Sequence, residues 1–284
     1  MPNVSLALGD IEYEDTGGDG PVLVFLHGLV MNGSVWRHIV AGLRQDFRCV
    51  VPLLPVGAHR IAIAPDRTLS PSSVADMIVE LIQTLDLRGP VLIETDGGRA
   101  QTVASRRPDL LGGLVLISCE AFDNYPPGLA GKVVKLAARV PGGLTLMLQA
   151  FRFRPLRRLP TAWGLMTKRP VPDAVMDGWM APVLTDRAIR RDLRRYLLAA
   201  RPSDMLDAVD ELRRFERSSL VVWAREDRMM PLRHGERLAR ILPRGQLVVI
   251  DDAFTLISED QPAKLLEVLA AFLAPLRHGA PPGS

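Results

Sequence analysis

The most constraining feature of this chain is an alternation of short apolar runs with segments of helical periodicity. The apolar runs cover residues 22–26, 49–51, 91–93, 114–117, 220–223 and 247–250, and runs of this kind are typical of parallel strands buried on both faces. Helices are expected at 36–43, at 70–85 with Pro71 in the first turn, and at 262–273. The alternation predicts an α/β fold with a doubly wound, mostly parallel sheet.

The alternation is interrupted between residues 123 and 212, where helical periodicity is broken repeatedly by proline. We interpret this stretch as an inserted cap of short helices, and residues 1–122 and 213–284 as the core domain. Apolar residues of the cap either fill its own core or line a pocket beneath it. The pocket candidates are Leu144, Met147, Leu148, Phe151, Trp163, Met166 and Trp179.

Length and charge limit the class of function. A chain of 284 residues forms one large core rather than two catalytic domains. Its 35 Lys and Arg residues are interleaved with 32 Asp and Glu residues, which argues against a nucleic-acid partner. No apolar run is long enough to cross a membrane, so we expect a cytoplasmic protein. The apolar residues of the cap lead us to expect a small apolar molecule as its partner. We also expect residues 278–284 to be disordered.

The two cysteines, Cys49 and Cys119, both lie in apolar runs. Free cysteines in such surroundings usually behave as small buried side chains. Neither a disulfide nor a metal site is indicated, and no sequence feature calls for a cofactor.

Four motifs occur in order along the chain outside the cap. The first is the run 22–29, which ends in His27, Gly28 and Leu29; the others are Trp36, the segment 52–59 and the segment 223–227 followed by Pro231. Together they resemble the α/β-hydrolase superfamily, in its capped branch of haloalkane dehalogenases and epoxide hydrolases. The resemblance implies the α/β-hydrolase fold and an oxyanion hole to which the Leu29 N–H contributes.

That superfamily carries its nucleophile on a sharp strand-to-helix turn, and residues 93–99 are expected to form this turn. Counting from the preceding helix makes Asp96 the nucleophile and Gly97 the second oxyanion donor. Counting back from Gly97 and Gly98 makes Thr95 the nucleophile instead. A third interpretation is an ordinary turn in which Asp96 caps the helix. The family prefers glycine two residues before the nucleophile. That position is Glu94 if Asp96 is the nucleophile and Ile93 if Thr95 is.

Two acids are candidates for the acid of a catalytic triad. Glu120 follows the strand at 114–117, as in haloalkane dehalogenases, and Asp227 occupies the position that is more widespread in the superfamily. Each has a structural alternative, as a loop carboxylate or a turn residue. We also count five residues near these motifs as candidates for contact with the substrate: His27, Trp36, Glu94, Phe122 and Thr255.

The catalytic histidine expected from the resemblance is missing. The family places it in the loop before the last helix, and residues 251–262 contain none. Spacing from Gln261 and Pro262 puts Thr255 at that position, where a hydroxyl cannot accept a proton near neutral pH. The chain's five histidines lie elsewhere; His59, on a loop that can approach the pocket, is a weak candidate for the base.

The catalytic triad is therefore expected to be eroded, and three functions remain open. The first is a non-hydrolytic tailoring enzyme, such as a cyclase, lyase or isomerase, that moves protons with a desolvated carboxylate. The second is a hydrolase of esters, epoxides or alkyl halides that uses Asp96 or Thr95. The third is a ligand-binding protein without catalysis. A resemblance in fold does not choose among them.

Overall fold

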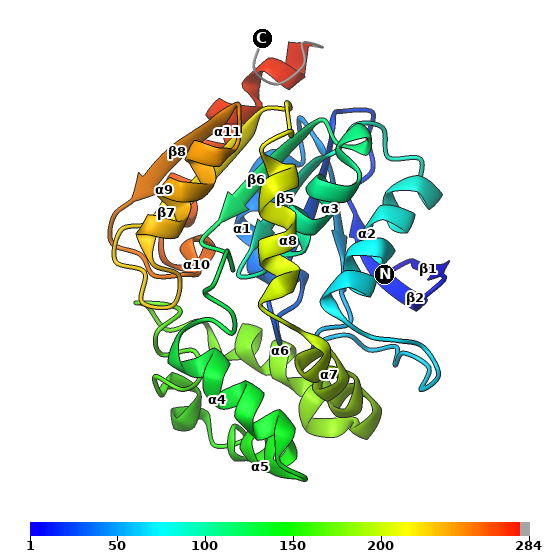
Figure 1. Ribbon diagram of the computed structural model, residues 1–284, viewed down its shortest axis with the longest axis vertical. Helices are drawn as coiled ribbons and strands as arrows, with labels where there is room; N and C mark the ends of the chain where they lie inside the picture. Colours follow the sequence, from blue (N-terminus) through cyan, green and yellow to red (C-terminus); the bar gives the residue numbers. More distant parts are fainter. Residues whose placement is uncertain (279–284) are drawn as a thin grey trace.

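The computed structural model describes residues 1–278, and the segment 279–284, most of the expected disordered tail, lies outside the described residues (Figure 1). Its centre is a sheet with the strand order β1-β2-β4-β3-β5-β6-β7-β8. β1 pairs antiparallel with β2, and β2 with β4, while all later pairs are parallel. The strands are β1 (Asn3–Leu6), β2 (Gly9–Asp15), β3 (Val22–Leu26), β4 (Arg48–Pro52), β5 (Val91–Thr95), β6 (Gly113–Ile117), β7 (Ser219–Ala224) and β8 (Gly245–Ile250).

Helices cover both faces of the sheet (Figure 1). On one side α2 (Pro71–Thr84), α3 (Arg99–Arg106) and α8 (Ser203–Leu212) pack side by side, and α9 (Leu232–Ile241) packs on β7 and β8. α1 (Arg37–Leu43) and α11 (Pro262–Leu273) pack against each other on the opposite side. Short helices η1 (Gly33–Trp36), η2 (Pro108–Leu110), α10 (Ile257–Asp260) and η4 (Ala274–His278) complete this part of the fold.

The predicted fold class is confirmed, and so is each predicted parallel strand. β5, β6 and β7 are mostly apolar because both of their faces are buried. β8, at the edge of the sheet, is partly exposed and does not fit the expectation of burial on both faces. The start of α2 is also as predicted: the Ser70 hydroxyl accepts from the Ser73 N–H, and the Ser73 hydroxyl accepts from the Ser70 N–H. The antiparallel strands β1 and β2 were not predicted, because both are partly exposed and carry polar residues.

The segment between β6 and β7 forms a helical layer over one end of the sheet (Figure 1). It contains α4 (Gly128–Arg139), α5 (Gly143–Ala150), η3 (Arg154–Arg158), α6 (Asp173–Thr185) and α7 (Arg187–Ala199). α8 lies within the range that the sequence assigned to the cap, but it packs against α3 of the core. No helix within residues 1–278 is long and apolar enough to span a membrane.

The strand order places the site. β3 lies between β4 and β5, so the chain proceeds first to one side of β3 and then to the other. Ligands of open α/β sheets bind at such a switch point, outside the carboxyl ends of the strands. Leu26 pairs with Glu94 at those ends, which brings the turn after β3 beside the turn after β5.

Candidate active site

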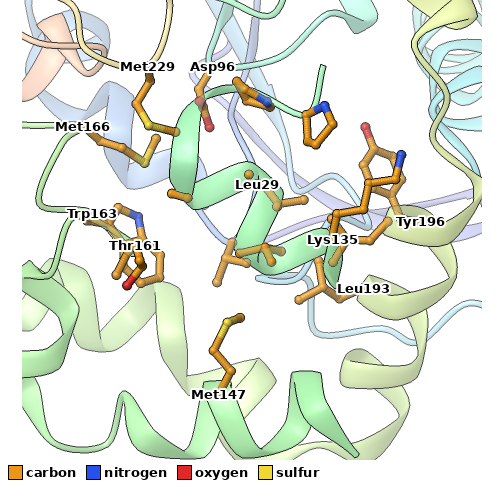
Figure 2. Close-up of a pocket in the computed structure, with 18 of the residues that line it drawn as sticks. Leu29, Asp96, Lys135, Met147, Thr161, Trp163, Met166, Leu193, Tyr196 and Met229 are labelled. Carbon is orange, nitrogen blue, oxygen red and sulfur yellow. The ribbon is translucent and has the colours of Figure 1, made fainter. Parts of the chain in front are cut away.

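A pocket lies between the carboxyl ends of the central strands and the cap. The core contributes Leu29 after β3, Asp96 after β5 and Glu120 after β6, while the cap contributes mostly apolar side chains (Figure 2). Its free space is about 100 Å³, below the range of roughly 300–1,000 Å³ that small-molecule sites usually occupy. The pocket therefore suits a small apolar group.

Several of the predicted substrate contacts line this pocket. Met147 and Phe151 of the α5 segment and Trp163 of the following loop lie in its wall, together with Leu144, Leu148 and Met166. Figure 2 shows Met147 across the cavity from Asp96. These cap residues share one apolar face that is turned toward the sheet.

Other predicted contacts lie outside the pocket, each for a structural reason. Trp36 is fully buried beside Phe25, with ring centroids 5.2 Å apart. Trp179 is fully buried in α6 and donates from Nε1 to the Ser34 hydroxyl at 2.8 Å. Phe122 packs against His234, with 5.6 Å between the rings. We therefore correct these three assignments: all three side chains form the interior of the protein.

The geometry of the β5–α3 turn favours one of the two registers for the nucleophile. Asp96 has φ +57°, in the left-handed region that residues other than glycine rarely adopt. Its carboxylate borders the pocket. Thr95 is instead the last residue of β5, is 1% exposed and does not line the pocket. The turn therefore presents Asp96 and not Thr95 to the pocket, which favours the Asp96 register.

Close packing around Asp96 explains two glycines. A side chain at Gly28 would place its Cβ 2.2 Å from Oδ2 of Asp96. A Cβ at Gly97 would lie 2.1 Å from Nη2 of Arg99 and 2.4 Å from Oε1 of Glu94. Both positions need glycine because there is no room for a side chain. The bulky Glu94 fits beneath this turn because residue 97 has no side chain.

A buried ion pair lies beneath the turn. Glu94 is fully buried, and its carboxylate accepts from Nε of Arg99 at 2.8 Å and from the Ala100 N–H at 2.6 Å. Arg99 also donates to the His27 carbonyl at 2.7 Å and to the Tyr196 hydroxyl of α7 at 3.3 Å. Glu94 does not line the pocket, so its assignment to substrate contact is corrected: it holds Arg99, which does line it.

Burial controls the protonation of the carboxylates in the pocket. It raises the pKa of Asp96 to about 7, although Arg99 and a hydrogen bond from the Leu29 N–H lower it. Burial and the nearby Asp96 also raise the pKa of Glu120 well above its usual range. Asp96 is thus poised near neutral pH, and the predicted oxyanion donor Leu29 contacts its carboxylate.

The acid position after β7 is occupied by Asp227. Oδ1 of Asp227 accepts from the Met229 and Met230 N–H groups at 2.9 and 2.8 Å, and from the Thr255 hydroxyl at 2.8 Å. Thr255 thus lies beside Asp227, one of the two acids that the sequence left open, at the position where spacing put the family's histidine. Both residues are outside the pocket wall, and Thr255 is fully buried, so its assignment to substrate contact is corrected.

The histidines whose side chains the structure describes do not line the pocket. His27 is fully buried; its Nε2 accepts from the Leu54 N–H, and burial lowers its pKa to about 3. It therefore orders its turn as a neutral ring, and its assignment to substrate contact is corrected because it does not line the pocket. His59 accepts from the Gly57 N–H and lies 3.5 Å from Asp192 of α7. His234 contacts the Ala121 carbonyl through Nδ1, and His38 lies on α1.

Five polar residues of the pocket were missed from the sequence: Arg99, Tyr125, Lys135, Thr161 and Tyr196. Lys135 of α4 donates to the Ala200 carbonyl at 2.6 Å and lies 5.2 Å from the ring centroid of Tyr125. The five-residue spacing of Glu94 and Arg99 across a tight turn was the available signal for the ion pair. The other four residues all lie in the cap segment, and nothing in the local sequence distinguishes them from surface positions.

The residues described hold no cluster of three or more His, Cys, Asp or Glu side chains with the arrangement of a metal site. The two cysteines are both buried and free. The polar groups that line the pocket are the carboxylates of Asp96 and Glu120, the Arg99 guanidinium, the Lys135 ammonium and several hydroxyl groups.

Comparisons with known proteins agree with the fold. The sequence matches the alpha/beta hydrolase family over residues 23–268. It is 26% identical to a cis-3-alkyl-4-alkyloxetan-2-one decarboxylase of Xanthomonas campestris pv. campestris, covering 93% of this chain and 92% of that protein. It is 27% identical to a haloalkane dehalogenase of Mesorhizobium japonicum over 65% of this chain and 60% of that protein.

Solved structures show the same architecture. An ancestral haloalkane dehalogenase superposes with a TM-score of 0.79 at 21% identity, covering 98% of this chain and all of the other. A thermophilic esterase of Thermogutta terrifontis gives a TM-score of 0.71 at 22% identity, with 98% and 100% covered. Identity at this level shows the fold alone.

Proposed function

The chain belongs to the alpha/beta hydrolase family, and from that premise we propose that it is a non-hydrolytic enzyme that transfers protons on a small apolar substrate. One observation carries the proposal: the acid Asp227 accepts a hydrogen bond from the Thr255 hydroxyl at 2.8 Å. In the family's chemistry, the group beside this acid is an imidazole. Asp96, with a pKa of about 7, is the group available for proton transfer.

The proposed step abstracts a proton from a carbon next to a carbonyl group. The carboxylate of Asp96 takes the proton, and the electron pair of the broken C–H bond moves onto the carbonyl oxygen. The Leu29 N–H, which contacts the carboxylate before the step, can then stabilise the negative charge on that oxygen. The proton returns to the same or a neighbouring carbon in an isomerase, or a leaving group departs in a lyase.

Hydrolysis lacks a base in this arrangement. An ester formed on Asp96 must be cleaved by a water molecule from which a base removes a proton. The Thr255 hydroxyl is a donor to Asp227 and has no useful basicity near neutral pH. The family's standard cycle would therefore stop at the covalent intermediate.

Proton exchange tests the proposal directly. Four-carbon ketones and esters, which fit the small pocket, are incubated with the protein in D2O, and loss of the α-proton signal is followed by NMR. We expect exchange that rises with pD to a plateau above about 7, since the ionised form of Asp96 is the base. Asp96→Asn should lower the rate about a hundredfold or more.

Thr95→Ala provides the matched control, because Thr95 is the buried neighbour of Asp96 and lies outside the pocket wall. This variant should exchange at the rate of the unmodified protein. Exchange that is undetectable, or equal in Asp96→Asn and the unmodified protein, would contradict the proposal.

The second candidate function is hydrolysis with Asp96 as nucleophile. It is favoured by the left-handed backbone of Asp96, which presents its carboxylate as a nucleophile turn does, and by the similarity to a haloalkane dehalogenase. Intact mass measured after incubation with small haloalkanes, epoxides and esters distinguishes the two. Turnover, or an alkyl or acyl adduct that Asp96→Asn abolishes, would replace the first proposal with the second. Tight binding with neither exchange nor adduct would indicate a ligand-binding protein.

A further inference from the structure

The cap carries an unbalanced positive charge, although charges of both signs are interleaved over the chain as a whole. Between Asp123 and Asp173 the sequence has nine Lys and Arg residues and no acidic residue. The whole chain has 35 basic and 32 acidic residues, so the imbalance is local to this segment, which contains α4, α5 and η3. A surface with one sign of charge attracts partners of the opposite sign.

Exposed aliphatic side chains lie on α4 and α5. Leu129, Leu136 and Val140 are spaced seven and four residues apart, which places them in one row along α4 and at its end. Leu146 lies on α5, which packs against α4. All four side chains are between 50% and 75% exposed, and we call them the cap ridge. Both helices lie at the end of the molecule opposite the C-terminus (Figure 1).

The two sides of α4 have different surroundings. Ala130 and Val134 line the pocket, on the side of the helix opposite the cap ridge. Lys132 and Arg139 lie beside the ridge and are exposed, and neither side chain forms a hydrogen bond or ion pair with the residues that the structure describes. Helix α4 thus covers the pocket with one side and presents leucine and basic side chains with the other.

A basic groove adjoins the end of the cap ridge. Val140 and the start of α5 form one wall of this groove, and one face of α7 forms the other. We call it the arginine groove. The residues of α7 that line it are Arg187, Arg190, Arg191 and Arg194.

The positive charge of the arginine groove is only partly balanced. Arg190 and Arg194 donate to backbone carbonyl groups, which are neutral. Arg191 contacts the buried carboxylate of Asp192. The Arg187 side chain is exposed and forms no hydrogen bond or ion pair within residues 1–278. The groove therefore adds positive charge beside the exposed aliphatic side chains.

This combination fits a membrane surface better than other partners. A symmetric contact between two copies of the cap would bring like charges together, which is unfavourable. Nucleic-acid bases stack on aromatic side chains, whereas the cap ridge is aliphatic. A membrane takes up exposed leucine side chains at its interface, and its anionic headgroups attract Lys and Arg.

We propose that the cap docks on the surface of an anionic lipid membrane. The cap ridge enters the boundary between headgroups and acyl chains, and the arginine groove, Lys132 and Arg139 contact the anionic headgroups. The contact is peripheral, because no helix within residues 1–278 is long and apolar enough to span a membrane. It is independent of the reaction in the pocket, since α4 faces the pocket with its other side.

Co-flotation with lipid vesicles tests the proposal. We expect the protein to float with vesicles of equal parts phosphatidylcholine and phosphatidylserine but not with phosphatidylcholine alone, and its binding to fall as salt is added. Leu146→Ser removes the most exposed side chain of the cap ridge and should weaken binding about fivefold or more. Arg139→Glu/Arg187→Glu reverses two charges and should weaken binding about tenfold or more.

Matched variants elsewhere on the surface provide the controls. Leu206→Ser changes an exposed leucine of α8, which packs against the core. Arg88→Glu/Arg217→Glu reverses two exposed charges that precede β5 and β7, at the end of the sheet away from the cap. Both controls should bind vesicles as the unmodified protein does. All four variants should keep its Tm, because every changed side chain is exposed.

Three results would overturn the proposal. The first is equal weakening by the control and test variants, which would show general attraction of anions. The second is equal binding to both kinds of vesicle, which would remove the role of the basic residues. The third is no binding to the mixed vesicles; analytical ultracentrifugation, and titration with polyglutamate and single-stranded DNA, would then show whether the same residues bind a second copy, an acidic protein or nucleic acid instead.

Discussion

Replacing Asp96 with asparagine should change how the stability of the protein depends on pH. In the native state burial raises the pKa of Asp96 from 3.8 to about 7. Between these two values the unfolded chain has released the proton while the native state still holds it. The carboxylate therefore makes the free energy of unfolding fall as pH rises from about 4 to 7. Above pH 7 Asp96 is ionised in both states, and the free energy of unfolding falls no further on its account. Asparagine carries no such cost.

The size of the effect follows from the shift. One pKa unit corresponds to about 1.4 kcal/mol, and a change from pH 5 to pH 8 passes through the last two units before the native pKa. From pH 5 to pH 8, the free energy of unfolding of Asp96→Asn relative to that of the unmodified protein should thus rise by about 2–3 kcal/mol. For a domain of this size we expect a relative rise in Tm of roughly 4–12 °C.

Urea unfolding at pH 5 and at pH 8, followed by tryptophan fluorescence, measures this difference. Asp19→Asn, at an exposed position, is the control for removing one negative charge, and its stability should run parallel to that of the unmodified protein. Parallel curves for Asp96→Asn would refute the reasoning, because they would show that Asp96 is already ionised in the native state at pH 5.

Three other variants test single contacts of the site. Thr255→His places an imidazole beside Asp227, and we expect ester or haloalkane hydrolysis to appear or to rise at least about tenfold; a folded variant with no gain would count against the explanation of the missing base. Arg99→Met leaves Glu94 buried without its partner and should lower the free energy of unfolding by about 3–5 kcal/mol in urea; a loss under about 1 kcal/mol would contradict the ion pair. Gly28→Ala puts a Cβ 2.2 Å from the Asp96 carboxylate and should lower proton exchange about tenfold or more, whereas an unchanged rate would show that the carboxylate can move aside.

Several features of the site were already determined by local sequence. The apolar runs predicted strands β3, β5, β6 and β7, because a strand buried on both faces is mostly apolar. The spacing to Gln261 and Pro262 located Thr255, and the structure places its hydroxyl on Asp227. Covalent spacing along a strand, turn and helix fixes such positions without distant contacts.

The tertiary structure alone decided which candidates meet at the pocket. Helical periodicity shows that Met147 and Trp179 lie on apolar faces, but it cannot show that one face borders the pocket and the other is packed against the core. The register of the nucleophile turn depended on the backbone of Asp96, which the surrounding packing holds at φ +57°.

The protonation of the site was also beyond the reach of the sequence. Asp96 and Asp19 are the same residue type, and what raises the pKa of Asp96 is burial between two turns that are distant along the chain. The sequence thus determined which residues follow each strand of this protein, since that order is local. The folded chain decided which of them touch, which are dehydrated and which carry charge, because those properties depend on neighbours that the sheet and the cap bring together.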